Sequence, residues 1–342
     1  MGWFRPVPIF CRYIRLRVTP LFTQTQGTSP VGSPTSWDPL RYWVQRGITR
    51  YVQEVMGVFL AFLTLVFWGF GDFLIQKSTR KFGDSIALFY ITAAGMIGFF
   101  PWVIGDLRTI TASPFNLFLL LSAGIVIFFA GIFNFEGLRK GKISVIEPIF
   151  ALEVIVAAVL ASLILKEFLT AWQILWLSLG ILGILLVSLK SLAHLKKISL
   201  EKGVIYAFFG TLAMGFSNFF FGWGSREINP LMVNWFTDTF IVSILAIYLT
   251  RTSRWREVWR DWRKSKKLIL GVSILDNLAW LFFSYSMVLI PIAIATGISE
   301  SYIALAAILG LVFNKEKLKK HQWCGLVLAL AAGIIIAFTI PN

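Results

Sequence analysis

Ionisable residues are scarce in this sequence of 342 amino acids. Asp, Glu, Lys and Arg make up 14% of it and hydrophobic residues 57%, whereas about a quarter of the residues of a soluble domain are charged. This composition excludes a soluble globular protein and indicates that lipid surrounds most of the chain. Two cysteines, Cys11 and Cys324, and two histidines, His194 and His321, are too few for a disulfide framework or a ligand cluster. We therefore expect no structural metal site and no cofactor.

Acidic residues are fewer than basic residues. There are 17 Asp and Glu against 32 Lys and Arg, and the formal net charge is +15. A basic balance can indicate nucleic-acid binding, yet outside the N-terminal tail the Lys and Arg fall almost entirely in short segments between apolar runs. Membrane proteins keep cytoplasmic positive charge in such segments. We therefore predict membrane lipids, and no nucleic acid, as a partner of these basic residues.

Residues 1–56 differ in composition from the rest of the chain. They contain seven Arg and no Lys, and Asp38 and Glu54 are their only acidic residues. A basic, acid-poor segment can be a targeting sequence; it can also be upstream sequence translated in error, with Met56 as the natural start, or a disordered arm. We favour the second interpretation. Residues 1–56 are thus assigned to a basic N-terminal tail, disordered or not native, without a catalytic role.

Ten apolar stretches follow Met56, each close to the roughly 20 residues that a helix needs to cross a bilayer. Because backbone groups in lipid must bond internally, each stretch is expected to be a helix. The predicted spans are 57–76, 84–105, 115–135, 143–165, 170–189, 203–223, 229–249, 267–289, 292–313 and 322–340. The connection between the eighth and ninth is so short, and marked by Pro291, that these two must form a tight antiparallel pair. The predicted fold class is an all-α integral membrane protein.

The second half of the chain repeats the first. Offsets of 149 and 146 residues bring like residues into register: Lys166 and Glu167 with Lys315 and Glu316, Gln173 with Gln322, Asp72 with Asn218, and Arg80 with Arg226. Chance similarity between Leu- and Ala-rich helices does not account for these polar matches. We predict a five-helix repeat over 57–190, a linker over 191–202 and a second five-helix repeat over 203–340. Because five is odd, the second repeat enters from the opposite side, and such inverted repeats are a physical basis for alternating access.

Two passages carry a resemblance to a known family. They are FWGFGDFLIQKSTRKFG in the first span and ISVIEPIFALEVIVAAVLASLILKEFLTAWQILWLSLGILGILLVS, repeated more loosely as IAIATGISESYIALAAILGLVFNKEKLKKHQWCGLVLALAAGIIIAF. Through them residues 57–340 resemble the EamA-like branch of the drug/metabolite transporter superfamily. In that family a Gly-Glu pair usually ends the fourth helix of each half, where this chain has Lys166-Glu167 and Lys315-Glu316. The resemblance implies a ten-helix transporter and does not choose among amino-acid, sugar, nucleotide-sugar and drug carriers.

Positive charge is uneven over the connections between spans. With the tail left out, twenty-two Lys and Arg follow the odd-numbered spans, and three, Arg108, Lys166 and Arg226, lie on the other side. The positive-inside rule places the odd-numbered connections in the cytoplasm and both ends of the core outside, whereas many members of the family resemble the reverse. We expect a multi-pass protein of the cell membrane in this orientation.

The connection before the eighth span, residues 251–267, is rich in both Trp and positive charge. Trp255, Trp259 and Trp262 fall at helical spacing on one face, with Arg and Lys over the others. A solvated basic loop would leave three Trp exposed. The pattern therefore favours a helix that lies on anionic lipid headgroups.

Several carboxylates fall inside predicted spans, where a charged group costs roughly 2.5 to 3.5 kcal/mol on insertion scales. They are Asp72 in the first span, Glu147 and Glu153 in the fourth, Asp238 in the seventh, Asp276 in the eighth and Glu300 in the ninth. Basic residues are nearly absent at comparable depth, so a charged carboxylate there needs water, a proton or a cationic substrate group. We predict an acidic cavity.

Helical spacing arranges the polar residues in three stripes that can line one pocket. The stripes are Asn234 with Asp238, Asp276 with Trp280 and Ser284, and Thr296 and Ser299 with Glu300. Glu147 and Glu153 point about 120° apart, so at most one of them faces this pocket. Pro148 or Gly297 is a predicted hinge.

These observations define two sets of candidate residues. Those for substrate binding are Trp68, Asp72, Asn218, Asn234, Asp238, Asp276, Trp280, Thr296 and Glu300. Those for proton coupling are Asp238, Glu300, Glu153 and Glu147. Structural alternatives stand beside them: Asp72 is close to the basic cytoplasmic interface, an Asn can join helices, and membrane Trp commonly packs against neighbouring helices.

We predict a secondary transporter and not an enzyme. It would move a small polar metabolite, such as an amino acid, amine or sugar, across the cell membrane by alternating access, with proton coupling as one option. The alternative is a membrane-embedded transferase acting on lipid-linked substrates, against which stand the missing long hydrophilic loops and catalytic constellations. A non-transporting sensor or scaffold is a third class. The expected partners are a small-molecule substrate and lipids; the substrate, direction, coupling ion and oligomeric state stay open.

Overall fold

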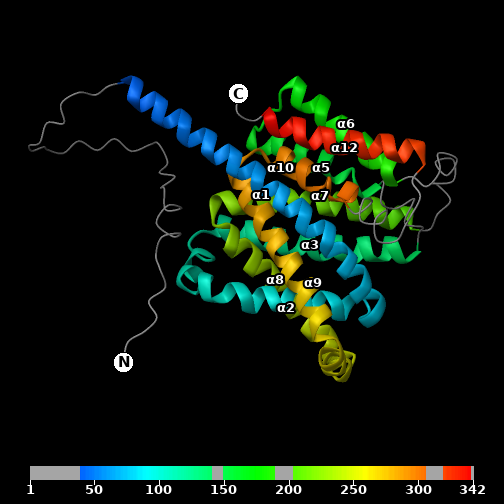
Figure 1. Ribbon diagram of the computed structural model, residues 1–342. Helices are drawn as coiled ribbons and strands as arrows, with labels where there is room; N and C mark the ends of the chain where they lie inside the picture. The colour runs from blue at the N-terminus through cyan, green and yellow to red at the C-terminus, as the bar shows by residue number, and fades with distance from the viewer. Residues whose placement is uncertain (1–38, 141–148, 189–202, 306–318, 340–342) are drawn as a thin grey trace, which may run out of the picture. The chain divides into compact units, whose positions relative to one another are not determined.

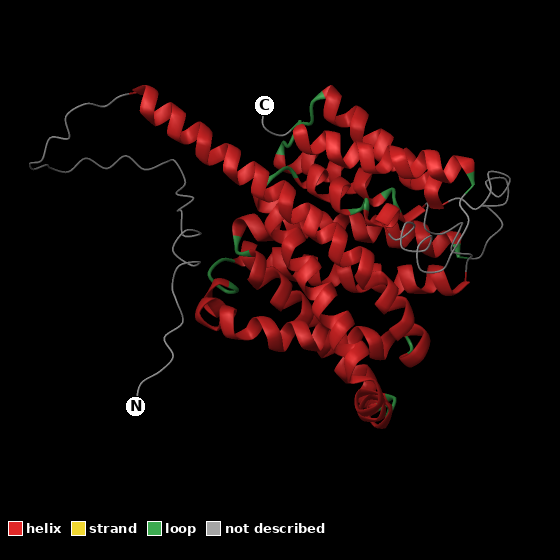
Figure 2. Cartoon of the chain, in the orientation of Figure 1, coloured by secondary structure: helices red, strands yellow, loops and turns green. Residues whose placement is uncertain are grey.

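The described part of the protein is built from helices. A computed structural model describes residues 39–140, 149–188, 203–305 and 319–339, and it leaves out the side chains of residues 39–48 and of a few positions inside helices. Within these ranges there is no strand (Figure 2). The chain divides into two units, Met1–Gln45 and Arg46–Asn342. Of the first unit the structure describes only residues 39–45, which begin the first helix, and the rest of the fold belongs to the second unit.

Among the described residues, seven helices are long and apolar enough to cross a membrane. They are α1 (Pro39–Phe82), α2 (Asp84–Val103), α3 (Pro114–Lys140), α7 (Val204–Glu227), α8 (Pro230–Arg251), α9 (Trp255–Leu289) and α12 (Lys320–Phe338). Shorter apolar helices stand at the remaining predicted spans: α5 (Glu153–Leu160) with the π-helical turn η2 (Ala161–Leu165), α6 (Ala171–Ser188) and α10 (Ile292–Ser299). A 3₁₀ helix, η1 (Ile104–Thr109), follows α2. Helices therefore occupy each predicted position, while ten membrane crossings stay a prediction.

Two helices are longer than their apolar runs. Helix α1 begins at Pro39, so residues 39–56 continue it and the predicted boundary at Met56 is not a break in the helix. Helix α9 begins at Trp255, and non-helical backbone angles at Ser265 separate its basic first part from the apolar span. The predicted connection of two residues before α10 is confirmed, since α9 ends at Leu289 and α10 begins at Ile292.

The basic first part of α9 is helical, as predicted, but its three Trp side chains do not share one exposed face. The ring of Trp255 packs against Phe89 of α2, with centroids 5.4 Å apart, and that of Trp262 against Tyr90, at 6.3 Å. Trp259 is 61% exposed. Trp255 and Trp262 therefore anchor this segment to α2, and its predicted position on lipid headgroups stays a prediction.

The helices pair in a pattern that matches the sequence duplication. Helix α2 packs on α8 and α6 on α12, and each of these pairs joins corresponding helices of the two repeats (Figure 1). Helix α3 packs on α7. Its counterpart is the contact of α1 with α9, where Thr64 Oγ1 donates to the carbonyl of Ala279 over 3.4 Å. Such a set of pairs is what a two-fold relation between repeats produces.

Helix α6 approaches α12 at a distance that only small residues permit. A Cβ atom on Gly183 would lie 2.5 Å from the backbone nitrogen of Ala329 and 2.8 Å from the carbonyl oxygen of Gly325. One turn earlier, a Cβ on Gly180 would lie 3.3 Å from Ala332. Since lipid provides no hydrophobic drive between helices, close packing of this kind is what holds them together.

The fourth helix of each repeat is interrupted at matching places. In the first repeat a turn at Ala151 and Leu152 precedes α5, and in the second a turn at Glu300 and Ser301 follows α10. Both turns bond over three residues: Leu152 N donates to Ile149 O at 3.1 Å, and Ser301 N to Ile298 O at 3.2 Å. Of the two predicted hinges, Pro148 lies outside the described residues. Gly297 lies inside α10, and the break comes three residues after it.

Candidate functional site

Two buried carboxyl groups meet where the fourth helices are interrupted. Glu153 is 5% exposed and Glu300 is 6% exposed. Their side chains are hydrogen-bonded to each other, and Asn218 Nδ2 donates to Glu153 Oε1 at 3.1 Å. A carboxylate only accepts hydrogen bonds, so a bond between two carboxyl groups requires a proton on one of them. The pair is therefore a place where a proton can be held among apolar helices.

Each carboxyl comes from a different repeat. Glu153 is the first residue of α5 and Glu300 caps the end of α10. At the offset of 149 residues that relates the fourth helices, Glu300 matches Ala151 and Glu153 matches Tyr302, so the two carboxyl groups lie close to matching places but are not equivalent residues. Interrupted membrane helices commonly form substrate and ion sites, because the break frees backbone groups and polar side chains there.

Helix α7 comes close enough to supply the third member of this group. A Cβ atom on Gly215 would lie 2.4 Å from Val156 Cβ and 2.9 Å from the carbonyl oxygen of Glu153. The missing side chain lets α7 pack directly on α5. Asn218 follows Gly215 by three residues on the same helical face and so reaches the carboxyl group of Glu153.

A second polar group lies between α2, α8 and α9. Asp238 Oδ2 and Asn277 Oδ1 both face Gly95, where a Cβ atom would lie 1.8 Å and 2.0 Å from them. Asn277 Nδ2 donates to Ile91 O at 2.9 Å and to Ser273 O at 2.8 Å, and these bonds fix the orientation of its amide. Two acceptor oxygens therefore face each other beside Gly95. A proton or a cationic group between them would satisfy both.

Asp276 adds negative charge to this second group. It precedes Asn277 in α9 and interacts electrostatically with Asp238. The two predicted carboxylates of α8 and α9 are thus near enough to influence each other electrostatically. Asn277 and Gly95 were missed: Asn277 stands next to a predicted residue in an apolar span, and nothing in the sequence marks Gly95.

An aromatic cluster joins α1, α7 and α9 to the segment after α10. Trp68 of α1 packs against Trp280 and Phe283 of α9, with ring centroids 5.3 and 5.1 Å apart, and against Tyr302 at 5.9 Å. Phe221 of α7 packs on Trp280 at 4.8 Å. Trp280 follows Asp276 by one helical turn and Tyr302 follows Glu300 by two residues. The rings that could stack on a substrate, predicted at Trp68 and Trp280, are therefore in contact.

Other predicted residues make contacts of their own. Asn234 Nδ2 donates to Ser284 Oγ at 2.8 Å and to Pro230 O at 2.8 Å, which ties α8 to α9. Thr296 Oγ1 donates to Ile292 O, at 2.8 Å, within its own helix. The three predicted stripes thus contribute to separate contacts. The side chain of Asp72 and the whole of Glu147 lie outside the described residues.

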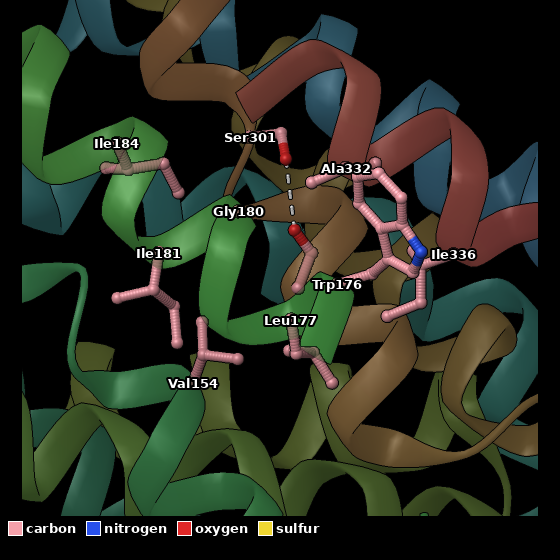
Figure 3. Close-up of a pocket in the computed structure, with 11 residues that line it drawn as sticks. Val154, Trp176, Leu177, Gly180, Ile181, Ile184, Ser301, Ala332 and Ile336 are labelled. Atoms are coloured by element: carbon pink, nitrogen blue, oxygen red, sulfur yellow. Dashed lines mark hydrogen bonds between the residues drawn. The ribbon is translucent and has the colours of Figure 1, made fainter. Parts of the chain in front are cut away.

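A small cavity lies beside the carboxyl pair, between α5, α6, α10 and α12 (Figure 3). Val154, next to Glu153, and Ser301, next to Glu300, line it together with Trp176 and Leu177 of α6. Ser301 Oγ donates to Gly297 O at 3.1 Å across its edge (Figure 3). About 10 Å³ of it is open to the centre of a water molecule. Such a volume holds about one water, so this cavity is too small for a metabolite.

No group of three or more His, Cys, Asp and Glu side chains that could hold a metal ion occurs within residues 39–140, 149–188, 203–305 and 319–339. Both polar groups consist of carboxyl and amide side chains. The chemistry that they offer is the binding of protons and of cationic hydrogen-bond donors.

Known proteins resemble this chain in both sequence and fold. The model of the EamA-like transporter family matches the chain twice, over residues 55–189 and 201–338. A solved structure described only as "Crystal structure of protein" is similar with a TM-score of 0.65 and 11% sequence identity, over 83% of this chain and 97% of that one. At this identity the likeness concerns the fold alone. No curated protein sequence matches the chain.

Proposed function

The chain belongs to the EamA-like transporter family, and from that premise we propose that it is a secondary transporter which carries a small polar metabolite across the cell membrane by alternating access. A membrane transporter of the drug/metabolite type follows from the family itself. Family membership also favours a transporter over a membrane-embedded transferase. Beyond family membership, we propose that ten helices span the membrane as two inverted five-helix repeats. We also propose the class of the solute and the identity of the coupling ion.

The observation that carries proton coupling is the burial of Glu153 and Glu300 as an interacting pair of carboxyl groups beside Asn218. One carboxyl comes from each repeat, so a movement of one repeat against the other separates the pair. A separated carboxyl group that meets water exchanges its proton with the solution on that side. The pair therefore binds a proton in the closed state and releases it to the side toward which the repeats have opened.

The second polar group supports a solute with a positively charged amine. Asp238 and Asn277 present two oxygens to the same place, and Asp276 adds negative charge there. An ammonium group donates up to three hydrogen bonds and accepts none. The rings of Trp68 and Trp280 would hold the rest of the solute or face its cation. Amines and amino acids fit this set better than sugars.

The test requires a solute first. A thermal-shift screen of purified protein against amino acids, amines, sugars and nucleotides identifies ligands, because binding to the folded state raises its stability. Uptake of the best ligand is then measured in proteoliposomes with an imposed pH gradient, together with exchange of labelled for unlabelled solute without a gradient.

The decisive variant is Glu153→Gln. An amide at this position can still donate to Glu300, so it imitates the protonated pair. We expect it to abolish accumulation driven by the pH gradient while exchange without a gradient continues. Glu227→Gln, at an exposed residue at the end of α7, is the matched control and should behave as the wild type. Gradient-driven accumulation at the wild-type level in both Glu153→Gln and Glu300→Gln would remove the pair from the mechanism.

A further inference from the structure

An ion pair joins the two repeats at one end of the bundle. Arg226 lies in the last turn of α7, in the second repeat, and pairs with Glu167, which follows η2 in the first. The side chains are 25% and 16% exposed, respectively, so the pair is mostly enclosed by its neighbours. Ile292 N, at the start of α10, donates to the other carboxylate oxygen of Glu167 at 2.9 Å. These contacts between the repeats lie at one face of the bundle, because the ends of α7 and η2 and the start of α10 lie there.

The pair spans the break between α9 and α10. Arg226 Nε donates to the carbonyl of Met287 at 2.6 Å, and its Nη2 to that of Ile290 at 3.0 Å. The positive guanidinium thus caps the carbonyl end of α9, and the negative carboxylate caps the amide end of α10. Each charge has the sign that the helix end beside it favours. The arrangement is a built junction of four chain segments, not a chance surface contact.

The local backbone turns Glu167 toward this junction. Lys166 adopts the left-handed conformation, with φ 60° and ψ 31°, and its backbone caps the π-helical turn η2. Glu167 N donates to Ala161 O at 3.2 Å, which closes the end of the helix. Lys166 stands where the family usually has the Gly of its Gly-Glu pair. Its left-handed backbone directs the side chain of Glu167 toward α7 and α10.

We propose that Glu167 and Arg226 form a latch which closes this face of the transporter and which must open in each transport cycle. The reason lies in where the bonds run. Both bonds of Glu167 join the first repeat to the second, whereas the carbonyl bonds of Arg226 stay within the second repeat. A relative movement of the repeats that opens this face breaks the bonds of Glu167 and leaves those of Arg226 in place. Glu167 is thus a positioning residue of the transport cycle.

A buried serine beside the latch provides the reporter. Ser225 is 3% exposed and precedes Arg226 in α7, so a cysteine there meets a water-soluble thiol reagent only when this face opens. Ser78, 1% exposed and near the end of the first span, reports on the opposite face in the predicted topology. Both cysteines are introduced singly after Cys11→Ser and Cys324→Ser. The full chain in membrane vesicles is labelled with a membrane-impermeant methanethiosulfonate added to each side in turn.

We expect Glu167→Gln to raise the labelling rate of Ser225→Cys by about ten- to a hundredfold, the effect of losing a hydrogen bond to a charged group on a two-state equilibrium. Because the two faces open in alternation, labelling of Ser78→Cys should fall in the same variant. Arg226→Lys keeps the charge and loses the planar fork, and should lie between Glu167→Gln and the wild type. The matched control is Glu257→Gln, which removes a local ion pair with Arg254 at 2.8 Å and should change neither rate.

Two results would overturn the latch. Labelling of Ser225→Cys that is equal in Glu167→Gln and Glu257→Gln would show that the pair does not close the face. A rise at both reporters would show loosened structure instead of alternation. The inference rests on the alternating access proposed above, but labelling needs neither a solute nor a proton gradient. A failure of proton coupling at Glu153 would therefore leave this test intact.

Discussion

Substitution of Gly183 by alanine tests whether close contact between α6 and α12 holds the two repeats together. The added methyl carbon would lie 2.5 Å from Ala329 N and 2.8 Å from Gly325 O, where ordinary contact begins at 3.4 Å. Both neighbours are backbone atoms, which cannot rotate away. The helices must therefore separate by about 1 Å, because repulsion rises steeply at shorter distances.

Separating the helices destabilises the protein by more than the higher helix propensity of alanine stabilises it. Extra methyl groups in well-packed sites cost about 1 to 3 kcal/mol, whereas Gly to Ala in a helix contributes about 1 kcal/mol in the opposite direction. The shift also reaches the buried cluster of Ala151, Ile184, Ala304, Leu326 and Ala329 beside both helix interruptions. We expect Gly183→Ala to be about 1 to 3 kcal/mol less stable than a variant that gains the same methyl in open space, because the gain in helix propensity is common to both.

Gly98 provides that comparison, since nothing lies within 4 Å of its Cβ position in α2. Unfolding of both purified variants by sodium dodecyl sulfate is followed through tryptophan emission, with Trp172, Trp176 and Trp323 reporting from α6 and α12. A midpoint for Gly183→Ala equal to that for Gly98→Ala would refute the argument. It would mean that the seam between the repeats tolerates expansion.

Two further substitutions probe the helix end and the second polar group. Lys166→Gly should raise the unfolding temperature by a few degrees, because the left-handed conformation costs an ordinary residue about 1 to 2 kcal/mol and glycine nothing sterically; an unchanged or lower value would contradict this. Gly95→Ala places a methyl against Asp238 and Asn277, and should weaken binding of the solute found by thermal shift at least tenfold, a loss of about 1.4 kcal/mol, while Gly98→Ala leaves it unchanged. Equal affinities in the two glycine variants would separate this group from solute binding.

Hydrophobic runs located the helices well because lipid leaves the backbone no other form. They located the ends less well. The first part of α9 is amphipathic and basic, so it lacks an apolar run, and its helix depends on the packing of Trp255 and Trp262 against α2. The interruption at Glu300 leaves no trace in hydropathy either. Gly297 drew attention to α10, but there the glycine serves close packing, since a Cβ atom would lie 2.8 Å from Leu177 Cδ2.

The candidate residues could be found from the sequence, but their partners could not. Carboxyl groups in apolar spans are visible in any sequence of this kind. Spacing along one helix then shows which residues share a face, not which neighbouring helix that face meets. Asn234 and Asp238 share a face of α8, yet Asn234 bonds Ser284 while Asp238 meets Gly95. Likewise Glu153 and Glu300 were separate candidates until the fold paired them.

The fourth helix of the first repeat connects the two devices proposed here. Glu153 begins α5 and bonds the second repeat in the interior; Glu167 follows η2, and bonds the second repeat at one face. Between them lie α5 and η2, a continuous helical segment from residue 153 to 165. A rigid helix transmits a displacement at one end to the other, so a change that separates the carboxyl pair also strains the latch. If both proposals hold, linkage requires that opening of the latch alter proton binding by the same free energy. The buried carboxyl pair would exchange its proton only when it meets water, and the proposed latch would determine the face from which that water comes.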